Sequence, residues 1–372
     1  MPRRAIVMTL FAAGAVCASA AALQAQGVDP TPEEYAALAA AAEAAPLFQS
    51  REPLVMTLRT GIEWLRRERN DTLEIEGTAT FVDLDGSTVT RPVDVRVRGN
   101  FRLSPDNCSF PPLRLDFPGG EMDGTVFEGE NQLKLVTPCD DRSDDYQRYI
   151  YDEYLAYRVH NLITPYSFRV RLVEITYEDV EGDYDTRTKI GFLIESDERM
   201  AERNRATYVE DIPLLDPRFV DGRQSVIAAV FNYMIGMLDW SAVELHNVRA
   251  IRTEDGRYVP VPYDFDFSGI VDARYAVPPP DITAQHRIRS VRQRLFRGFC
   301  RPELEHGWVS ELFLPKRPEI EQLYRGFELF DDADHAEDVI EYLGDFWDVM
   351  EDPNEFEDEI VRDCRELPAA GE

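Results

Sequence analysis

The chain has 372 residues, of which 44% are hydrophobic, and carries a formal net charge of −30 at pH 7. This length can bury a sizeable core in one large or two medium domains. So strong an acidic balance argues against nucleic acid as a partner, because the phosphates would be repelled.

The first 25 residues have the pattern of a cleaved secretory signal peptide. Arg3 and Arg4 give a positive start, residues 5–23 contain no charge, and a small-residue, polar exit follows. The stretch is also long enough for a retained membrane anchor, but its high alanine content and polar exit favour cleavage after Ala25. No later stretch is long and apolar enough to span a membrane. We therefore expect a bacterial periplasmic or secreted protein without a membrane span.

Cysteine usage agrees with export. Cys17 lies in the predicted signal peptide, which leaves four cysteines in the mature chain. An even number in an exported protein indicates two disulfides, although four cysteines allow three pairings and could also stay unpaired. The local pairing closes the shorter loops, and we expect it: Cys108 with Cys139, and Cys300 with Cys364.

The expected elements begin with a helical spacer at residues 26–50. A β-rich part follows, in which hydrophobic and polar residues alternate between turn signals. Antiparallel pairing through tight turns is the natural assembly of such short strands. The expected strands cover residues 55–59, 72–83, 88–98, 113–117 and 132–136.

The pattern then becomes mixed and finally helical. Residues 144–162 and 223–237 have helical spacing, and beyond residue 283 the chain is mostly helical and charged. Strands are expected at 168–177, 189–195, 248–252 and 258–262. A β-rich start, a mixed middle and a helical end together predict an α+β fold.

One cluster of polar residues is suited to phosphoryl transfer. Asp239, Asn247, Asp264 and Asp266 fall within 28 residues, on predicted loops or strand ends. Transfer to a hydroxyl needs a carboxylate to accept the proton, and Mg²⁺ prefers oxygen ligands such as these. The alternation of residues 264–267 predicts both Asp on one face and both Phe on the other. The alternative is that these Asp residues cap turns while the Phe residues fill the core.

Several short motifs occur in one order along residues 96–269. They are Arg98-Gly99-Asn100, Pro112-Leu113-Arg114-Leu115-Asp116-Phe117, Gln132-Leu133-Lys134-Leu135, Gly191-Phe192-Leu193-Ile194-Glu195, Asp239 with Asn247, and Asp264-Phe265-Asp266. Together they resemble the spore coat protein H (CotH-like) kinase family, an atypical branch of the protein-kinase-like fold. The resemblance implies a kinase-like domain at residues 51–372, with an N-lobe to about residue 200 and a C-lobe after it.

The resemblance also implies a function and a site. It implies binding of ATP and Mg²⁺ and phosphorylation of a protein substrate on Ser or Thr. Asp239 becomes the candidate base, Asn247 and Asp266 the candidate metal ligands, and Asp264 a further ligand candidate. We expect Asp239, Asn247 and Asp266 to converge, because base and metal must reach one phosphoryl group.

The nucleotide-binding residues are less sharply defined. Lys134 or Arg114 is expected to grip the phosphates, and Glu153 or Glu195 to pair with the lysine. The sequence departs from the family where Phe101 follows Asn100 in place of Ser or Thr, and it has no Gly-x-Gly-x-x-Gly loop. ATP is also scarce outside the cytoplasm. A non-catalytic structural or binding protein of the cell envelope is therefore the alternative.

A run of arginines stands out in the acidic C-terminal part. Six Arg occur within 15 residues, and on a helix four of them would share one broad face. They could form an anion site, or pair internally with the acidic C-terminal helices, which we favour. They are Arg287, Arg289, Arg292, Arg294, Arg297 and Arg301.

Overall fold

The computed structural model describes residues 31–210 and 212–367. The predicted signal peptide at residues 1–25 lies outside these ranges. The predicted spacer contains a helix, α1 (Pro32–Glu43). Its Thr31 cap accepts a hydrogen bond from the Glu34 amide, and the Glu34 side chain accepts one from the Thr31 amide.

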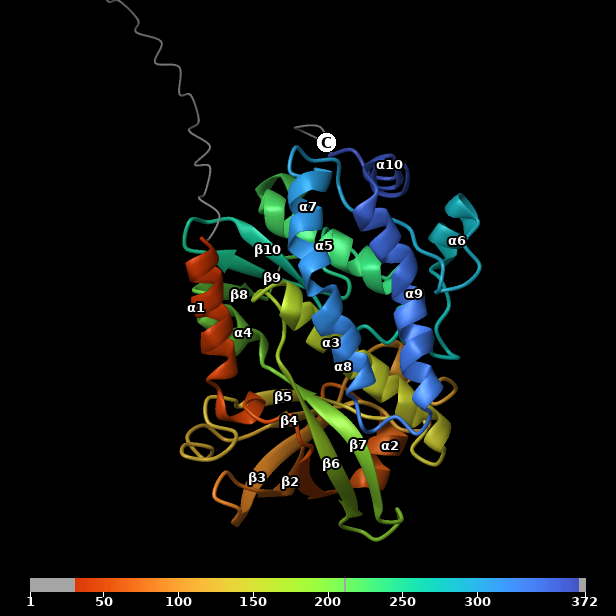
Figure 1. The fold of residues 1–372 in the computed structure, drawn as a ribbon. Helices are drawn as coiled ribbons and strands as arrows, with labels where there is room; N and C mark the ends of the chain where they lie inside the picture. The colour runs from red at the N-terminus through yellow and green to blue at the C-terminus, as the bar shows by residue number, and fades with distance from the viewer. Residues whose placement is uncertain (1–30, 211, 368–372) are drawn as a thin grey trace, which may run out of the picture.

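A β-barrel occupies one end of the molecule (Figure 1). Its strands follow the order β1-β2-β3-β4-β5-β7-β6, and neighbouring strands are antiparallel except β6 and β1. The strands are β1 (Leu54–Thr60), β2 (Ile75–Val82), β3 (Thr88–Val97), β4 (Leu113–Asp116), β5 (Gln132–Val136), β6 (Val170–Asp179) and β7 (Arg187–Ile194).

The barrel overturns one prediction. The class α+β is right, but the kinase-like fold is wrong, because the β-rich part closes on itself and is not the bilobal kinase arrangement. Closure comes from the parallel pairing of β1 with β6, in which Leu54 stands opposite Val173. This pairing uses both edges that an open sheet would leave exposed.

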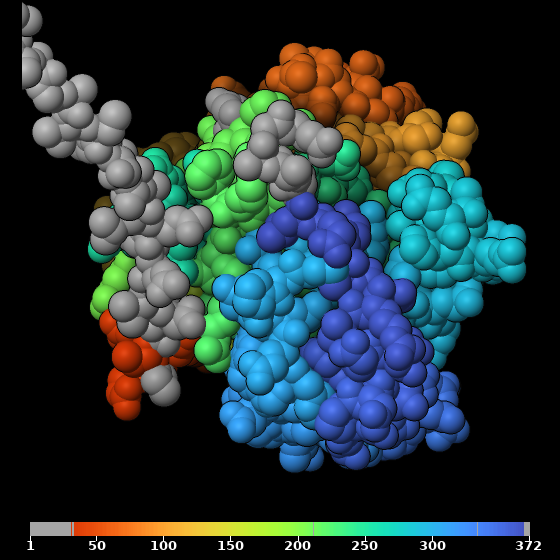
Figure 2. Space-filling view, turned by 90° about the horizontal axis from the view of Figure 1, so that it is seen from above, coloured from red at the N-terminus to blue at the C-terminus, as the bar shows by residue number. Residues whose placement is uncertain are grey.

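Helices and a smaller sheet form the other end of the molecule (Figure 1). In the sheet, β9 (Val248–Thr253) lies between β8 (Ala206–Val209) and β10 (Tyr258–Pro262). In Figure 2 the blue C-terminal helices cover much of the face away from the barrel, and the cyan segment around α6 projects at one side. The helices are α1 (Pro32–Glu43), α2 (Ile62–Glu68), α3 (Gln147–Ile163), α4 (Asp197–Arg203), α5 (Gly222–Ile235), α6 (Pro280–His286), α7 (His306–Phe313), α8 (Arg317–Arg325), α9 (Ala333–Glu351) and α10 (Pro353–Phe356).

Two large apolar cores hold this arrangement. One fills the barrel, with Leu58, Val95 and Leu115 fully buried. The other surrounds α3, which packs against β6, β7 and α8 and buries most of its length. Because α3 is buried on nearly all sides, its polar residues face the protein interior, and one of them, Glu153, interacts electrostatically with Asp264 and Asp266.

The cysteine prediction is confirmed. Cys108 is bonded to Cys139, and Cys300 is bonded to Cys364. Such bonds are typical of proteins that fold in an oxidising compartment. Among the described residues, no helix is both long and apolar enough to cross a membrane.

The arginine run was expected to be helical, but it is not. After α6 ends at His286, residues 287–300 lack regular helix, and two of the less exposed arginines brace the structure internally. Arg294 donates to the carbonyl of Tyr342 at 2.6 Å and lies 3.6 Å from Asp345 of α9. Arg297 donates to the carbonyls of Leu238 and Trp240, on either side of Asp239. Internal bracing is therefore the role of these two arginines, mainly through backbone carbonyls.

A buried carboxyl outside the barrel core gives the fold a testable pH response. Glu130 is fully buried, and its Oε2 atom accepts a hydrogen bond from the Ser196 amide. Its Oε1 atom has no hydrogen-bond partner within the described part of the chain. Burial, with the neighbouring Glu195 charge, raises the pKa of Glu130 to about 8.

We predict that Glu130→Gln flattens the stability profile between about pH 5 and pH 8. A carboxyl whose folded-state pKa is raised stabilises the fold below its unfolded pKa, and this contribution is lost as pH rises through the folded value. The wild type should lose about 1.4 kcal/mol per pH unit across this window relative to the variant. Urea unfolding at several pH values measures this, and parallel profiles for the two proteins would contradict it.

Candidate functional site

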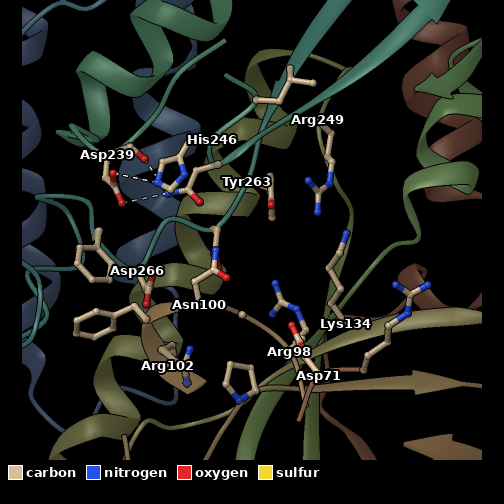
Figure 3. Close-up of a pocket in the computed structure, with 18 of the residues that line it drawn as sticks. Asp71, Arg98, Asn100, Arg102, Lys134, Asp239, His246, Arg249, Tyr263 and Asp266 are labelled. Carbon is tan, nitrogen blue, oxygen red and sulfur yellow. Dashed lines mark hydrogen bonds and ion pairs between the residues drawn. The ribbon is translucent and has the colours of Figure 1, made fainter. Parts of the chain in front are cut away.

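A cavity of about 530 Å³ lies where the barrel meets the smaller sheet. Strands β4 and β5, the end of β3 and the segment after it supply one wall, and the loops before β9 and after β10 supply most of the other (Figure 3). The two walls carry opposite charges. Most of the cations come from the barrel side, although Arg249 belongs to β9, and carboxylates come mainly from the other side.

The cationic wall is a ladder across neighbouring strands. Arg96 of β3 stands directly opposite Arg114 of β4, which stands directly opposite Lys134 of β5. All three line the cavity, together with Arg98 and Arg249. Like charges directly opposed across strands destabilise a sheet unless countercharges are supplied. Glu74 and Asp197 supply countercharges to Arg96 and Lys134, and an anionic ligand in the cavity would supply more.

Lys134 has a different protein partner from the two that were predicted. Its Nζ atom lies 2.7 and 2.8 Å from the two carboxylate oxygens of Asp197, the first residue of α4. Arg249 lies 3.5 Å from the same carboxylate. Glu195 instead pairs with Arg203 at 2.7 Å and does not line the cavity. Glu153 is near the opposite wall.

The acidic wall begins with Asp239. Its Oδ1 atom lies 3.0 Å from Nε2 of His246. The Asn247 side-chain amide donates to the backbone carbonyl of Asp239 at 2.7 Å. This contact uses Nδ2 of Asn247, so its Oδ1 atom is the one suited to bind a cation. The hydrogen bond to Asp239 also raises the pKa of His246.

Two buried carboxyls belong to this wall or adjoin it: Asp266 lines the cavity, and Glu153 interacts electrostatically with Asp266. Asp266 is 5% exposed and accepts a hydrogen bond from the Tyr275 hydroxyl at 3.1 Å. Burial and the adjacent Asp264 raise the pKa of Asp266 to about 7. Glu153, from α3, is 1% exposed, and burial followed by Asp266 and Asp264 raises its pKa well above the usual range. Arg102 and Arg98 supply only part of the positive charge that would balance these crowded acids.

Two of the predicted ligands have unusual backbone conformations. Asn247 has φ 50° and Asp264 has φ 63°, both in the left-handed region. The Asp264 amide donates to the Tyr157 hydroxyl of α3 at 2.8 Å, which helps to hold this turn. Asn and Asp tolerate the left-handed region better than other residues with a side chain, so the local sequence suits the geometry.

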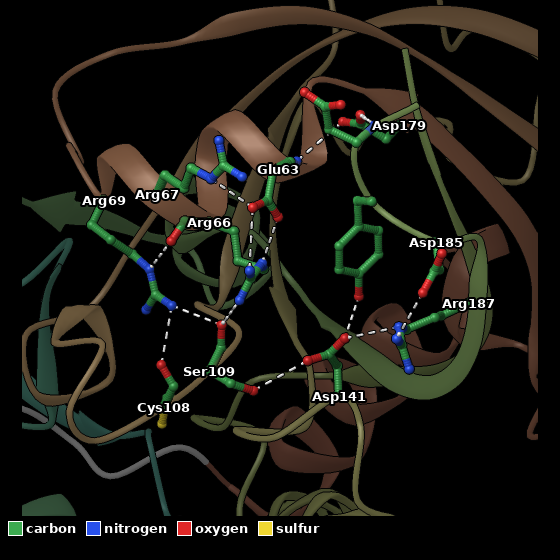
Figure 4. Close-up of polar contacts among 12 residues, drawn as sticks. Glu63, Arg66, Arg67, Arg69, Cys108, Ser109, Asp141, Asp179, Asp185 and Arg187 are labelled. Carbon is green, nitrogen blue, oxygen red and sulfur yellow. Dashed lines mark hydrogen bonds and ion pairs between the residues drawn. The ribbon is translucent and has the colours of Figure 1, made fainter. Parts of the chain in front are cut away.

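A braced loop carries Asn100 and Arg102 into the cavity. Arg69, just after α2, donates hydrogen bonds to four backbone carbonyls of this loop, those of Arg102, Leu103, Cys108 and Ser109. Figure 4 shows the bonds to Cys108 and Ser109. The bonds measure between 2.8 and 3.3 Å. The disulfide at Cys108 ties the same loop to the segment after β5. The loop position is therefore fixed from two directions.

Aromatic rings also join the loop to the opposite wall. Phe101 packs edge-on against Phe267 at 5.0 Å between ring centroids, and lies 5.8 Å from Tyr275. The predicted alternation is right for Asp264 and Asp266, which both line the cavity, and for Phe265, which is buried in the core. It is wrong for Phe267, because the chain turns after β10 and places this ring at the cavity.

Six of the eight predicted site residues line this one cavity: Arg114, Lys134, Asp239, Asn247, Asp264 and Asp266. Their individual roles stay predictions. Further charged residues of the site were not predicted, among them Arg96, Arg98, Arg102, Asp197, His246 and Arg249. Arg98 belongs to the Arg-Gly-Asn motif and could have been included on that ground. Asp197 follows a Ser that caps α4, which gave no sign of its contact with Lys134.

The donor set limits which metal could bind. No group of three or more His, Cys, Asp and Glu side chains in the described ranges is arranged to hold a metal ion. The predicted set has two carboxylates and one amide, which is too few for an all-protein cage. Mg²⁺ commonly takes one or two carboxylates and completes its shell with water and substrate phosphates. The residues fit that kind of site.

Comparisons with known proteins add no relative. No family model matches the chain, no curated protein is significantly similar to it, and no solved structure matches its fold. The resemblance to the CotH-like kinases therefore stays a prediction, and the function has to be argued from the cavity itself.

Proposed function

We propose that this protein is an exported phosphotransferase that uses ATP and Mg²⁺ to phosphorylate a Ser or Thr hydroxyl of a protein. The observation that supports this proposal most is that the two walls of the cavity carry opposite charges. A ladder of cations faces a set of carboxylate and amide oxygens within one space, in a chain whose net charge is −30. Polyphosphate needs the first wall, and a cation bound to polyphosphate needs the second.

Each wall would have a distinct task. Lys134, Arg114 and Arg98 would bind and orient the phosphate oxygens. Asp264, Asp266 and Asn247 would hold Mg²⁺, which when bound neutralises charge that develops on the transferred phosphoryl group. Binding donor and acceptor in one cavity also removes much of the entropic cost of bringing them together.

Asp239 would act on the acceptor. The hydroxyl oxygen forms a bond to the terminal phosphorus while the bond from phosphorus to the bridging oxygen of ADP breaks. The hydroxyl proton passes to Asp239, and ADP leaves with the bridging electrons. The hydrogen bond from His246 and the Asn247 contact with its backbone fix Asp239 for this task.

We predict that Mg²⁺ and ATP together stabilise the purified protein. Ligand at ten times its dissociation constant should raise the free energy of unfolding by about 1.4 kcal/mol. Lys134→Gln should lose most of this increment, because its positive charge lies on the phosphate-binding wall. Lys189→Gln is the matched control, since Lys189 pairs with Asp144 and does not line the cavity.

Thermal unfolding with ATP alone, Mg²⁺ alone and both ligands gives the comparison. The same increment in both lysine variants would place nucleotide binding elsewhere and contradict the proposal. Protein that binds the nucleotide but transfers no phosphate to any protein acceptor would support the non-catalytic binding role instead. Localisation outside the cytoplasm, which the disulfides favour, is tested by fractionation of the native host.

A further inference from the structure

Lys134 is in an environment that opposes its own charge. Its side chain is 11% exposed. It stands directly across from Arg114 in the β4–β5 register, and Arg249 and Arg98 also act on it electrostatically. A buried ammonium ion surrounded by guanidinium groups loses its proton easily unless a carboxylate compensates.

Asp197 is that carboxylate. Both of its oxygens bind the Lys134 ammonium, at 2.7 and 2.8 Å, and Oδ1 also lies 3.5 Å from Nε of Arg249. The ionic bonds therefore join three elements: β5, α4 and β9. Although burial alone would raise its pKa, Lys134 and Arg249 hold the pKa of Asp197 below its usual range, so it is charged at neutral pH.

Two aromatic rings also lie close to these cations. Nζ of Lys134 lies 5.4 Å from the ring centre of Tyr263 and 5.3 Å from that of Phe168. The Arg249 guanidinium lies 4.4 Å from the Tyr263 ring centre. Both cations thus share one carboxylate and one ring, which fixes them as a pair on the cavity wall.

We propose that Asp197 is the positioning residue of the cationic wall. It holds Lys134 and Arg249 in place, both positively charged, so that they can bind a polyphosphate. Asp197 does not line the cavity, so it would act through the two cations rather than by touching the ligand. The role in polyphosphate binding rests on the proposed function, whereas the effect on Lys134 can be measured without any ligand.

The charge of Lys134 gives the first readout. Burial, opposed mainly by Asp197, lowers the pKa of Lys134 to about 8. In Asp197→Asn the compensating charge is gone while burial and the cations stay, so the pKa should fall further. The charged and titratable groups around this ammonium are Asp197, Arg98, Arg114, Arg249 and Tyr263.

Lysine NMR can follow this group cleanly. The sequence contains only three lysines, Lys134, Lys189 and Lys316. A ¹³C-lysine sample therefore gives few signals, and Lys134→Met assigns the one of interest. We expect this signal to titrate near pH 8 in the wild type, at clearly lower pH in Asp197→Asn, and near the wild-type pH in Asp197→Glu. Glu198→Gln, at the exposed next position of α4, is the control and should leave the titration unchanged.

Polyphosphate binding gives the second readout. Inorganic tripolyphosphate is titrated calorimetrically from pH 6 to pH 9. Near pH 7.5, Asp197→Asn should bind it at least about tenfold more weakly than the wild type, which corresponds to about 1.4 kcal/mol. Affinity should recover as pH falls and Lys134 regains its proton. A loss that is equal at every pH would indicate a merely structural defect and overturn the proposal.

Further outcomes keep the inference separate from the proposed function. An unchanged Lys134 titration in Asp197→Asn overturns the positioning role, whatever binds in the cavity. If the wild type binds neither tripolyphosphate nor Mg²⁺ with ATP, the proposed function fails, and the NMR shift alone decides the effect of Asp197 on Lys134. Should Asp197→Asn not fold, Arg249→Met replaces it. Removing that cation should raise the Lys134 titration, and a fall would contradict the proposal.

Discussion

Asp239→Asn is expected to bind Mg²⁺ with ATP nearly as well as the wild type but to transfer phosphate at least about 10²-fold more slowly. An amide cannot accept the hydroxyl proton, and general base catalysis typically contributes about 10²- to 10⁴-fold in rate. The substitution preserves shape and leaves the backbone carbonyl that Asn247 contacts. Single-turnover kinetics with labelled ATP separate binding from transfer.

Asp266→Asn gives the contrasting result in the same assay. It removes a charge from the proposed metal shell, so binding of Mg²⁺ with ATP should be lost. It also relieves the crowding of like charges with Asp264 and Glu153, so the ligand-free protein should be at least as stable as the wild type. Glu254→Gln, on the exposed β9–β10 turn, is the control. If Asp239→Asn transferred phosphate at the wild-type rate, Asp239 would not be the general base.

Removing the Cys108–Cys139 disulfide is expected to cost about 4 kcal/mol of unfolding free energy. In the chain-entropy model the cost grows with the length of the closed loop, and the two cysteines are 31 positions apart. The Cys108→Ala, Cys139→Ala double variant should also bind Mg²⁺ with ATP more weakly, because the same bond holds the loop that carries Asn100 and Arg102 into the cavity.

The second disulfide provides a reference of similar size. Cys300 and Cys364 are 64 positions apart, so their removal should destabilise the fold by a comparable amount, about 4 kcal/mol. That bond does not reach the loop at residues 99–112. Denaturant unfolding and nucleotide titration of both double variants test the idea. Equal affinity losses in the two would show that the loop is not specifically held by Cys108.

Local patterns predicted most of the strands, but not how they join. The alternation at residues 88–98 and 132–136 matches β3 and β5 within a residue or so. Barrel closure depends on β1 pairing with β6, more than 100 residues later in the chain, for which neither strand carries a local signal. The resemblance to a kinase family favoured a bilobal arrangement at this point, and that was wrong.

As with the fold, the site residues that lie close together in sequence could be predicted, and the contacts between distant segments could not. Asp239, Asn247, Asp264 and Asp266 could be chosen from the sequence because they sit close together around one hairpin. Lys134 has its partner, Asp197, on a helix that follows two more strands, and spacing along the chain cannot reveal that contact. Glu153 or Glu195 was expected as its partner, but core packing of α3 places Glu153 where it interacts with Asp264 and Asp266 instead.

The left-handed backbone at Asn247 and Asp264 bears on how this protein could be engineered. Glycine adopts that conformation without a steric penalty, whereas side chains there cost of order 1 kcal/mol each. A screen that rewards heat resistance alone would therefore favour glycine at both positions and remove two oxygen donors from the cavity. Thermostable variants of this chain should be tested for ligand binding as well as for melting temperature, since the most stable of them would lack two of the proposed metal ligands.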